Sequence, residues 1–134
     1  SRFHQDHGFV QARYDARIVC ILPDRKKLYE NINTRVIRMI DSGLIEETRR
    51  LLDLGFGPEL RSMQTLAYKH VIDHLESKVD LDTAISRVQR DTRRYAKRQI
   101  TWVRSHYSPE SFLSPEEALP ILDGLLRDAL RAGA

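Results

Sequence analysis

The chain has 134 residues, of which 41% are hydrophobic, and this suffices for one modest core without requiring a second domain. It has no apolar run of about eighteen residues, which argues against a membrane span, and we expect a cytoplasmic protein. Its single cysteine, Cys20, excludes an internal disulfide framework, and the net charge is only +3.

The chain begins at Ser1 without an initiator methionine, so we expect a fragment of a longer protein. Residues 16–23 are a β-branched apolar run that ends at Pro-Asp, which predicts a buried strand. Only Ser111-Phe112-Leu113 offers a second extended segment. The sheet would therefore be completed by another chain or by missing sequence, and we expect the exposed strand edge to cause self-association.

Three helices are predicted next. Asp24 is a plausible N-cap for a helix that stops at Gly43, and a second helix covers residues 44–54 and ends at Gly55. Ser62 is the expected cap of the third. The first of these helices carries Arg35 beside its apolar face, where the guanidinium could reach either a diphosphate or a buried carboxylate.

The third helix opens with the residues Gln64-Thr65-Leu66-Ala67-Tyr68-Lys69, which place polar side chains and an ammonium near backbone N–H groups. Such a helix start favours anions. By itself this pattern is a weak indication of a site.

A long basic helix follows, capped by Asp80 or Asp82 and running to about Ser105. Its segment 87–104 has a charge of +6, because seven basic side chains accompany only one acid, Asp91. With a period of 3.6 residues, six side chains form an outer stripe: Arg87, Arg90, Arg94, Lys97, Thr101 and Arg104. Such cations can neutralise backbone phosphates, so nucleic acid is the leading partner and a membrane surface the second. The alternative is a solvated face that forms salt bridges.

Two further residues of this helix stand out. Trp102 lies one turn beyond Arg98, where it could hold the guanidinium or stack on an extruded base, although a core position is the commoner role. Gln99 is expected to point into the apolar face, where its amide needs a hydrogen-bond partner, either structural or from a ligand.

Ser114 is the expected N-cap of a last helix, with Pro115 at its first position and Glu116 and Glu117 in its first turn. No glycine-rich phosphate loop and no nucleophile with an adjacent base occurs in the chain. The sequence thus predicts a mainly α fold without a complete active site, and no metal site.

The sequence resembles the C-terminal part of the tRNA dimethylallyltransferase (isopentenyltransferase) family from about Ser1 to Leu113. The likeness is carried by residues 28–36, 42–47 and 68–69 and above all by Ala96-Lys97-Arg98-Gln99-Ile100-Thr101-Trp102-Val103-Arg104. It implies the helical end of a P-loop α/β enzyme that transfers a dimethylallyl group from dimethylallyl diphosphate to N6 of adenosine 37 beside the anticodon, with Mg²⁺.

The resemblance also implies site residues. The tRNA-binding segments fall on Gln64, Thr65, Leu66, Ala67, Tyr68 and Lys69 and on Lys97 to Arg104, and Arg35 would bind the diphosphate. Ala67 stands where the family usually has glycine, and Gln64 where some members have arginine. No catalytic residue and no Mg²⁺ site is expected in this chain, because the phosphate loop and the aspartate base would lie upstream.

We therefore expect 1–15 to be the tail of a helical insertion, 16–113 to be the core strand with the returning helices, and 114–134 to be a C-terminal helix. The chain would be one unit that binds the tRNA anticodon stem-loop but is inactive alone, and the full-length enzyme would be monomeric. Two alternatives remain: an autonomous helical nucleic-acid-binding module without catalysis, and a helical interaction domain whose arginines pair with acids of a partner.

Overall fold

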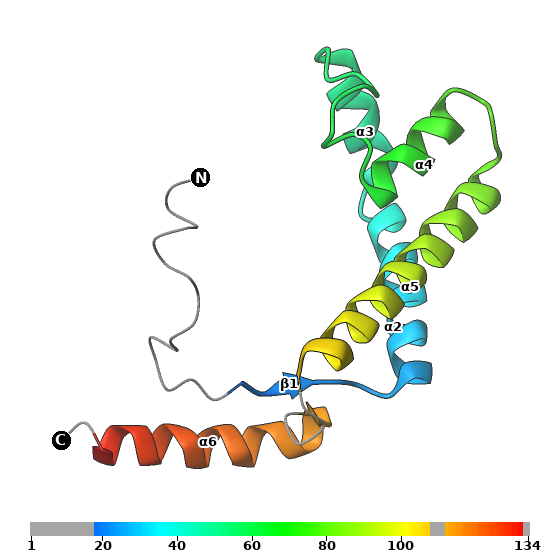
Figure 1. Ribbon diagram of the computed structural model, residues 1–134. Helices are drawn as coiled ribbons and strands as arrows, with labels where there is room; N and C mark the ends of the chain where they lie inside the picture. The colour runs from blue at the N-terminus through cyan, green and yellow to red at the C-terminus, as the bar shows by residue number, and fades with distance from the viewer. Residues whose placement is uncertain (1–17, 108–111, 133–134) are drawn as a thin grey trace, which may run out of the picture. The chain divides into compact units, whose positions relative to one another are not determined.

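A computed structural model describes residues 18–107 and 112–132 of the chain. These residues form five helices and a short parallel sheet, which confirms the mainly α fold (Figure 1). They divide into two compact units, one holding Leu22–Ser108 and the other holding the two strands and the last helix. The predicted tail 1–15 lies outside the described residues, and the predicted division of the chain stays a prediction.

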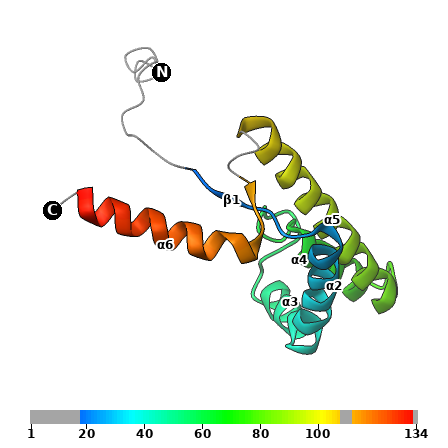
Figure 2. The same ribbon diagram turned by 90° about the horizontal axis from the view of Figure 1, so that it is seen from below.

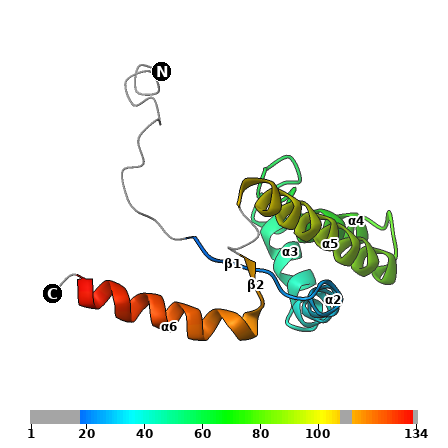
Figure 3. The same ribbon diagram turned by 60° about the horizontal axis from the view of Figure 1, so that its bottom comes forward.

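The unit Leu22–Ser108 contains four helices: α2 (Arg25–Asp41), α3 (Leu44–Asp53), α4 (Leu66–Leu75) and α5 (Leu81–His106). α5 packs against α4 and α2, and α3 packs against the same two helices. α4 lies beside the first half of α5, and the C-terminal half of α5 extends past it (Figures 1 and 3). Seen from below, α2 and α5 lie side by side (Figure 2).

The boundaries of α2 and α3 confirm the predictions. The Asp24 carboxylate accepts a hydrogen bond from the Lys27 N–H at 2.9 Å, as an N-cap does. Gly43, with φ of +96°, makes the left-handed turn between the two helices, which few other residues adopt without strain. In α3 the fully buried Thr48 donates to the Leu44 carbonyl at 2.7 Å, so its hydroxyl has a partner in the core.

The start of α4 differs from the prediction, because Ser62 is not its N-cap. The helix begins at Leu66 after Thr65, whose hydroxyl donates to the Ser62 carbonyl at 2.9 Å. Backbone hydrogen bonds hold the preceding residues in turns, and the buried Met63 fixes that loop to the core. A loop fastened by a buried side chain overrides the capping preference of a serine.

α5 is capped by Asp80, whose carboxylate accepts from the Thr83 N–H at 2.7 Å, and this decides between the two predicted caps. At 1.5 Å per residue, its 26 residues span roughly 39 Å, whereas the ten residues of α4 span roughly 15 Å. Ala84 and Val88 are its buried side chains. The helix is therefore packed along its first half and is largely exposed beyond.

The second unit contains β1 (Cys20–Ile21), β2 (Phe112–Leu113) and α6 (Pro115–Ala132). The strands are parallel, with Cys20 opposite Phe112 and Ile21 opposite Leu113. They lie where the sequence predicted them but are shorter. The prediction of a buried strand is wrong for the described residues, because Ile18 and Ile21 are 49% and 48% exposed and two paired residues provide no covering layer.

α6 begins as predicted. The Ser114 hydroxyl accepts from the Glu117 N–H at 3.3 Å, and the Glu117 carboxylate accepts from the Ser114 N–H at 2.8 Å, which is a reciprocal capping box. Ala118 is buried, whereas Leu119 and Leu126 are exposed. No helix among the described residues combines the length and apolar character that a membrane span needs.

A buried imidazole joins α4 to α5. His70 is 6% exposed, and its Nε2 lies 2.9 Å from Asp91 Oδ2. The hydrogen bond from Arg90, assisted by that from His70, holds the pKa of the Asp91 carboxyl well below its usual range. Because folding lowers this pKa, the carboxylate stabilises the fold above its ordinary pKa of 3.8, and this contribution is lost as the pH falls below that value.

We expect Asp91→Asn to lower the free energy of unfolding by about 1–3 kcal/mol at neutral pH, because it weakens the partner of a buried imidazole. The difference from the wild type should be fully present above about pH 5 and should shrink steadily as the pH falls below that, toward the lowered pKa of Asp91. Urea unfolding followed by circular dichroism measures both quantities. Asp53→Asn, at an exposed position, is the control, and an Asp91→Asn effect that does not change with pH would contradict this account.

Candidate nucleic-acid interface

The cations of α5 fall into two groups. Toward the start of the helix, Arg87 pairs with Asp73 at 3.5 Å, and Arg90 and Arg94 both pair with Asp91, at 2.8 and 3.5 Å. The salt-bridge interpretation of the basic stripe therefore holds for this half. Arg87 thus joins α5 to α4, and Arg90 and Arg94 pair with an acid of their own helix.

Arg93 also acts internally. Its guanidinium donates to the Asn33 side chain on α2, and the Gln89 amide donates to the Asn33 backbone carbonyl at 3.3 Å. Two side chains of α5 thus hold one residue of α2. Arg35 lies two residues further along α2, so this contact fixes the helix that carries the predicted diphosphate ligand.

The second group is free of such contacts. Lys97, Arg98 and Arg104 are exposed, and none forms an ion pair with another described residue. Exposed cations without an acidic neighbour are available to phosphates, which is what the sequence predicted for the stripe. On α5, the described cations without an acidic partner lie in the C-terminal half, and phosphate binding there stays a prediction.

Trp102 is 54% exposed, so the core interpretation is wrong. Its ring stacks on His106 with centroids 4.3 Å apart and meets the edge of Tyr107 at 6.1 Å. The guanidinium of Arg98 lies over Tyr95 at 5.7 Å instead of over Trp102. The indole face that His106 does not cover can therefore stack on a base.

Gln99 is exposed, which corrects the expectation that it points into an apolar face. It projects from nearly the same side of α5 as the buried Val88, three turns away. The helix has passed the start of α4 at that point, so this side is uncovered. Helical periodicity alone does not reveal where the neighbouring helix ends.

A shallow groove of about 540 Å³ follows this exposed half of α5. Its lining combines cations with the indole ring and two hydroxyls: Arg94, Lys97, Arg98, Thr101, Trp102 and Ser105. Cations beside an aromatic face are typical of single-stranded nucleic-acid binding. Ile100 and Val103, the remaining apolar residues of the predicted segment, are half-buried.

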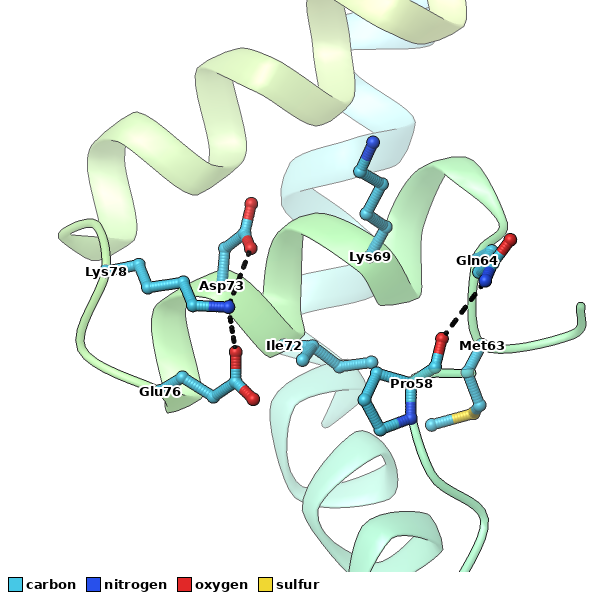
Figure 4. Close-up of a pocket in the computed structure, with 8 residues that line it drawn as sticks. All are labelled: Pro58, Met63, Gln64, Lys69, Ile72, Asp73, Glu76 and Lys78. Atoms are coloured by element: carbon cyan, nitrogen blue, oxygen red, sulfur yellow. Dashed lines mark hydrogen bonds and ion pairs between the residues drawn. The ribbon is translucent and has the colours of Figure 1, made fainter. Parts of the chain in front are cut away.

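The other predicted segment, 64–69, lies at the start of α4, and two of its residues, Gln64 and Lys69, line a separate cavity of about 470 Å³ (Figure 4). Gln64 donates to the Pro58 carbonyl at 3.4 Å, and Lys78 closes another side of the cavity through its ion pairs with Glu76 and Asp73. Lys69 is exposed and forms no ion pair with another described residue.

The other members of this segment are held by the protein. Tyr68 donates to the Glu47 carboxylate on α3, and this contact raises the pKa of the phenol. Thr65 binds the backbone, and Leu66 and Ala67 are half-buried. The segments 64–69 and 97–104 line different cavities, and the His70 contact with Asp91 joins the helices that carry them.

Arg35 is exposed on α2 and forms no ion pair with a described residue, so the buried-carboxylate alternative does not hold there. Sequence reasoning missed the His70 contact and the link through Asn33, because both join residues far apart in the chain. The lone acid Asp91 in a run of arginines was the one signal that could have indicated them.

Among the described residues, no three His, Cys, Asp or Glu side chains gather in a group that could hold a metal ion. The chemistry that the described residues of this surface can supply is cationic, hydrogen-bonding and aromatic, which is the chemistry that nucleic-acid-binding proteins use.

Comparisons with known proteins identify the family of this chain. The family model of IPP transferases matches residues 1–106, and the chain belongs to that family. It is 44% identical over 102 residues to tRNA dimethylallyltransferase 1 of Pelobacter propionicus, covering 76% of this chain and 33% of the relative. It is 42% identical over 116 residues to the tRNA dimethylallyltransferase of Alkaliphilus metalliredigens, covering 86% and 37%.

Solved structures of the same family resemble this fold. The tRNA delta(2)-isopentenylpyrophosphate transferase of Staphylococcus epidermidis superposes with a TM-score of 0.78 at 25% identity, over all of this chain and 43% of that one. The tRNA isopentenylpyrophosphate transferase of Bacillus halodurans gives 0.75 at 28% identity, over 98% and 44%. The chain thus spans about a third of the length of the curated relatives named here.

We expect Arg93→Ala to lower the free energy of unfolding by about 1 kcal/mol, because it removes the hydrogen bond to Asn33 that joins α5 to α2. Arg98→Ala, five residues further along the same helix, should leave the unfolding midpoint nearly unchanged. Urea titrations of the two variants measure this difference, and equal losses would contradict the division of the basic helix into two groups.

Proposed function

We propose that this chain is the tRNA-binding part of an enzyme that transfers a dimethylallyl group from dimethylallyl diphosphate to N6 of adenosine 37, beside the anticodon. The observation that carries the proposal is the exposed half of α5. It presents three cations that form no ion pair with another described residue, beside the only tryptophan of the chain, and the relatives of the chain are tRNA dimethylallyltransferases.

The reaction gives these side chains defined tasks. An adenine must leave the stack of the anticodon loop before its exocyclic amine can attack an allylic carbon, and an extruded base has to be held by stacking and by nearby cations. Trp102 and Arg98 can supply the first contact, and Lys97 and Arg104 can bind the flanking phosphates. Holding the amine in line with the carbon lowers the entropic part of the barrier.

The departing diphosphate needs positive charge near the oxygen atoms that take up the bonding electrons. Arg35 is exposed on α2 and suits this task. Gln89 and Arg93 of α5 hold Asn33 of α2. The helix that carries the proposed diphosphate ligand, α2, is therefore fastened to α5, which carries the proposed RNA surface. The phosphate loop, the aspartate base and the Mg²⁺ site are proposed to belong to the longer enzyme, and the chain alone is expected to be inactive.

The experiment that tests the proposal is a salt-dependent titration with an anticodon stem-loop that carries adenosines at positions 36 to 38, against a scrambled hairpin of equal length. Preference for the cognate loop supports recognition by segments 64–69 and 97–104. Equal affinities with a steep salt dependence favour a general nucleic-acid-binding module instead. Absence of binding to either hairpin would overturn the proposal.

We expect Lys97→Ala and Arg104→Ala each to weaken stem-loop binding and to reduce the slope of log K against log salt by up to about one, because each lost phosphate contact releases one counterion fewer. Arg87→Ala removes the same charge from a residue that pairs with Asp73 and should change the slope less. Fluorescence anisotropy at several salt concentrations measures the slopes. Equal effects of the three substitutions would show that only net charge matters.

We expect Trp102→Ala to weaken binding of the stem-loop by about 1–3 kcal/mol, the range found for loss of one stacked base. The salt slope should stay unchanged, since no charge is lost. Trp102→Phe retains an aromatic face and should recover part of the affinity. In the wild type, the fluorescence of this single tryptophan should be quenched on binding, and an emission unaffected by saturating RNA would argue against a stacked base.

A further inference from the structure

A second groove, of about 440 Å³, lies on the other side of the exposed half of α5, between that half and the start of α2. Lys97, Thr101 and Arg104 line it from α5, and Arg25 and Tyr29 line it from α2. The residues from α5 all belong to the segment proposed to bind tRNA. The residues from α2 have no role in that proposal.

The charge of this groove is unbalanced. Arg25, Lys97 and Arg104 are exposed and form no ion pair with another described residue. The one acid in the lining, Asp24, is engaged as the N-cap of α2, and its hydrogen bond to the Lys27 N–H lowers the pKa of the carboxyl. The Asp24 carboxylate stays ionised, but three cations against this one carboxylate leave the lining with a positive balance, which favours an anion in the groove.

Arg25 is held in place at the rim of the groove. Its Nε donates to the Tyr29 hydroxyl at 3.2 Å, and its guanidinium lies 5.2 Å from the centre of the tyrosine ring. These contacts use one donor of the guanidinium and leave its two terminal nitrogens available. A guanidinium fixed in this way can bind two oxygens of one phosphate, which a freely rotating side chain does less well.

We propose that this groove binds a backbone phosphate of the RNA strand that lies along α5, so that the tRNA interface continues onto α2 at Arg25, with Tyr29 as a positioning residue. The inference rests on the proposed function, because Lys97 and Arg104 take part in both. Lys97 and Thr101 line this groove and the one that holds Trp102, so they form a ridge between the two. A strand on this ridge has a phosphate on the Arg25 side and a base on the Trp102 side.

The test compares Arg25→Ala with Arg38→Ala in stem-loop titrations at several salt concentrations. Arg38 is the matched control, because it is an exposed arginine of the same helix, has no ion pair with a described residue and does not line the groove. We expect Arg25→Ala to weaken binding about fivefold to tenfold and to lower the salt slope by about one, with a clearly smaller effect of Arg38→Ala. Arg25→Lys should keep the slope but not the full affinity.

A second arm identifies the phosphate. Each stem-loop of a set carries a single methylphosphonate, which removes the charge of one phosphate. We expect one member of the set to bind the wild type more weakly than the unmodified stem-loop does. Arg25→Ala should bind this member and the unmodified stem-loop with equal affinity. Tyr29→Phe should weaken binding less than Arg25→Ala, since it removes only the hydroxyl that orients the guanidinium.

Equal affinities and slopes for Arg25→Ala and Arg38→Ala would overturn the inference, as would methylphosphonates that act alike on the wild type and on Arg25→Ala. In either case a wild type that still prefers the cognate loop leaves the proposed function standing. A wild type that binds no hairpin overturns both together. Unchanged thermal unfolding of each variant shows that the exposed substitutions leave the fold intact.

Discussion

The arrangement of the helical unit depends on Asp91, the single acidic residue among the seven basic ones between Arg87 and Arg104. Its carboxylate accepts a hydrogen bond from Arg90, lies within ion-pair distance of Arg94 and contacts the buried imidazole of His70 on α4. One residue therefore engages two of the cations and fixes the position of α4 along α5. Because no further acid follows on α5, Lys97, Arg98 and Arg104 have no acidic partner on their own helix, and the proposed RNA surface begins where this carboxylate no longer reaches.

The second constraint is the contact between α5 and α2 at Asn33. A backbone carbonyl and a side-chain oxygen of this one residue accept hydrogen bonds from Gln89 and Arg93, which lie one turn apart on α5. Gln89 and Arg93 flank Asp91 on α5 and precede the exposed cations, so α5 is fixed on two sides just before it leaves the packed part of the unit. The extending half then has a defined direction relative to α2. A surface that must accept a base and a phosphate at set positions requires such preorganisation.

Much of the fold could be predicted from local signals in the sequence. Asp24, Asp80 and Ser114 act as caps because a side-chain oxygen next to an unpaired backbone N–H is favourable in almost any surroundings. The predictions failed where the outcome depends on what lies alongside. Ser62 is not the N-cap of α4, because the loop that contains it is fixed by the buried Met63. The apolar run at residues 18–21 is half exposed in a sheet of two short strands. Gln99 and Trp102 are exposed because α4 is too short to cover α5. For the candidate site, composition and spacing pointed to α5, but only the contacts of Asp91 and Asn33 separate its internally bound arginines from the exposed cations beyond them.

Helical periodicity explains how one exposed half-helix can serve two kinds of contact. Residues 94, 98, 102 and 105 follow one line along α5, and residues 97, 100 and 104 follow another, with Thr101 between them. The first line carries the indole, and the second faces the cationic start of α2. A nucleotide strand also has two sides, with bases on one and phosphates on the other. Both lines carry cations, but only the first adds an aromatic face, and only the second faces a further arginine on α2. The exposed half of α5 can therefore offer a stacking surface on one side and a cationic groove on the other, which matches that division.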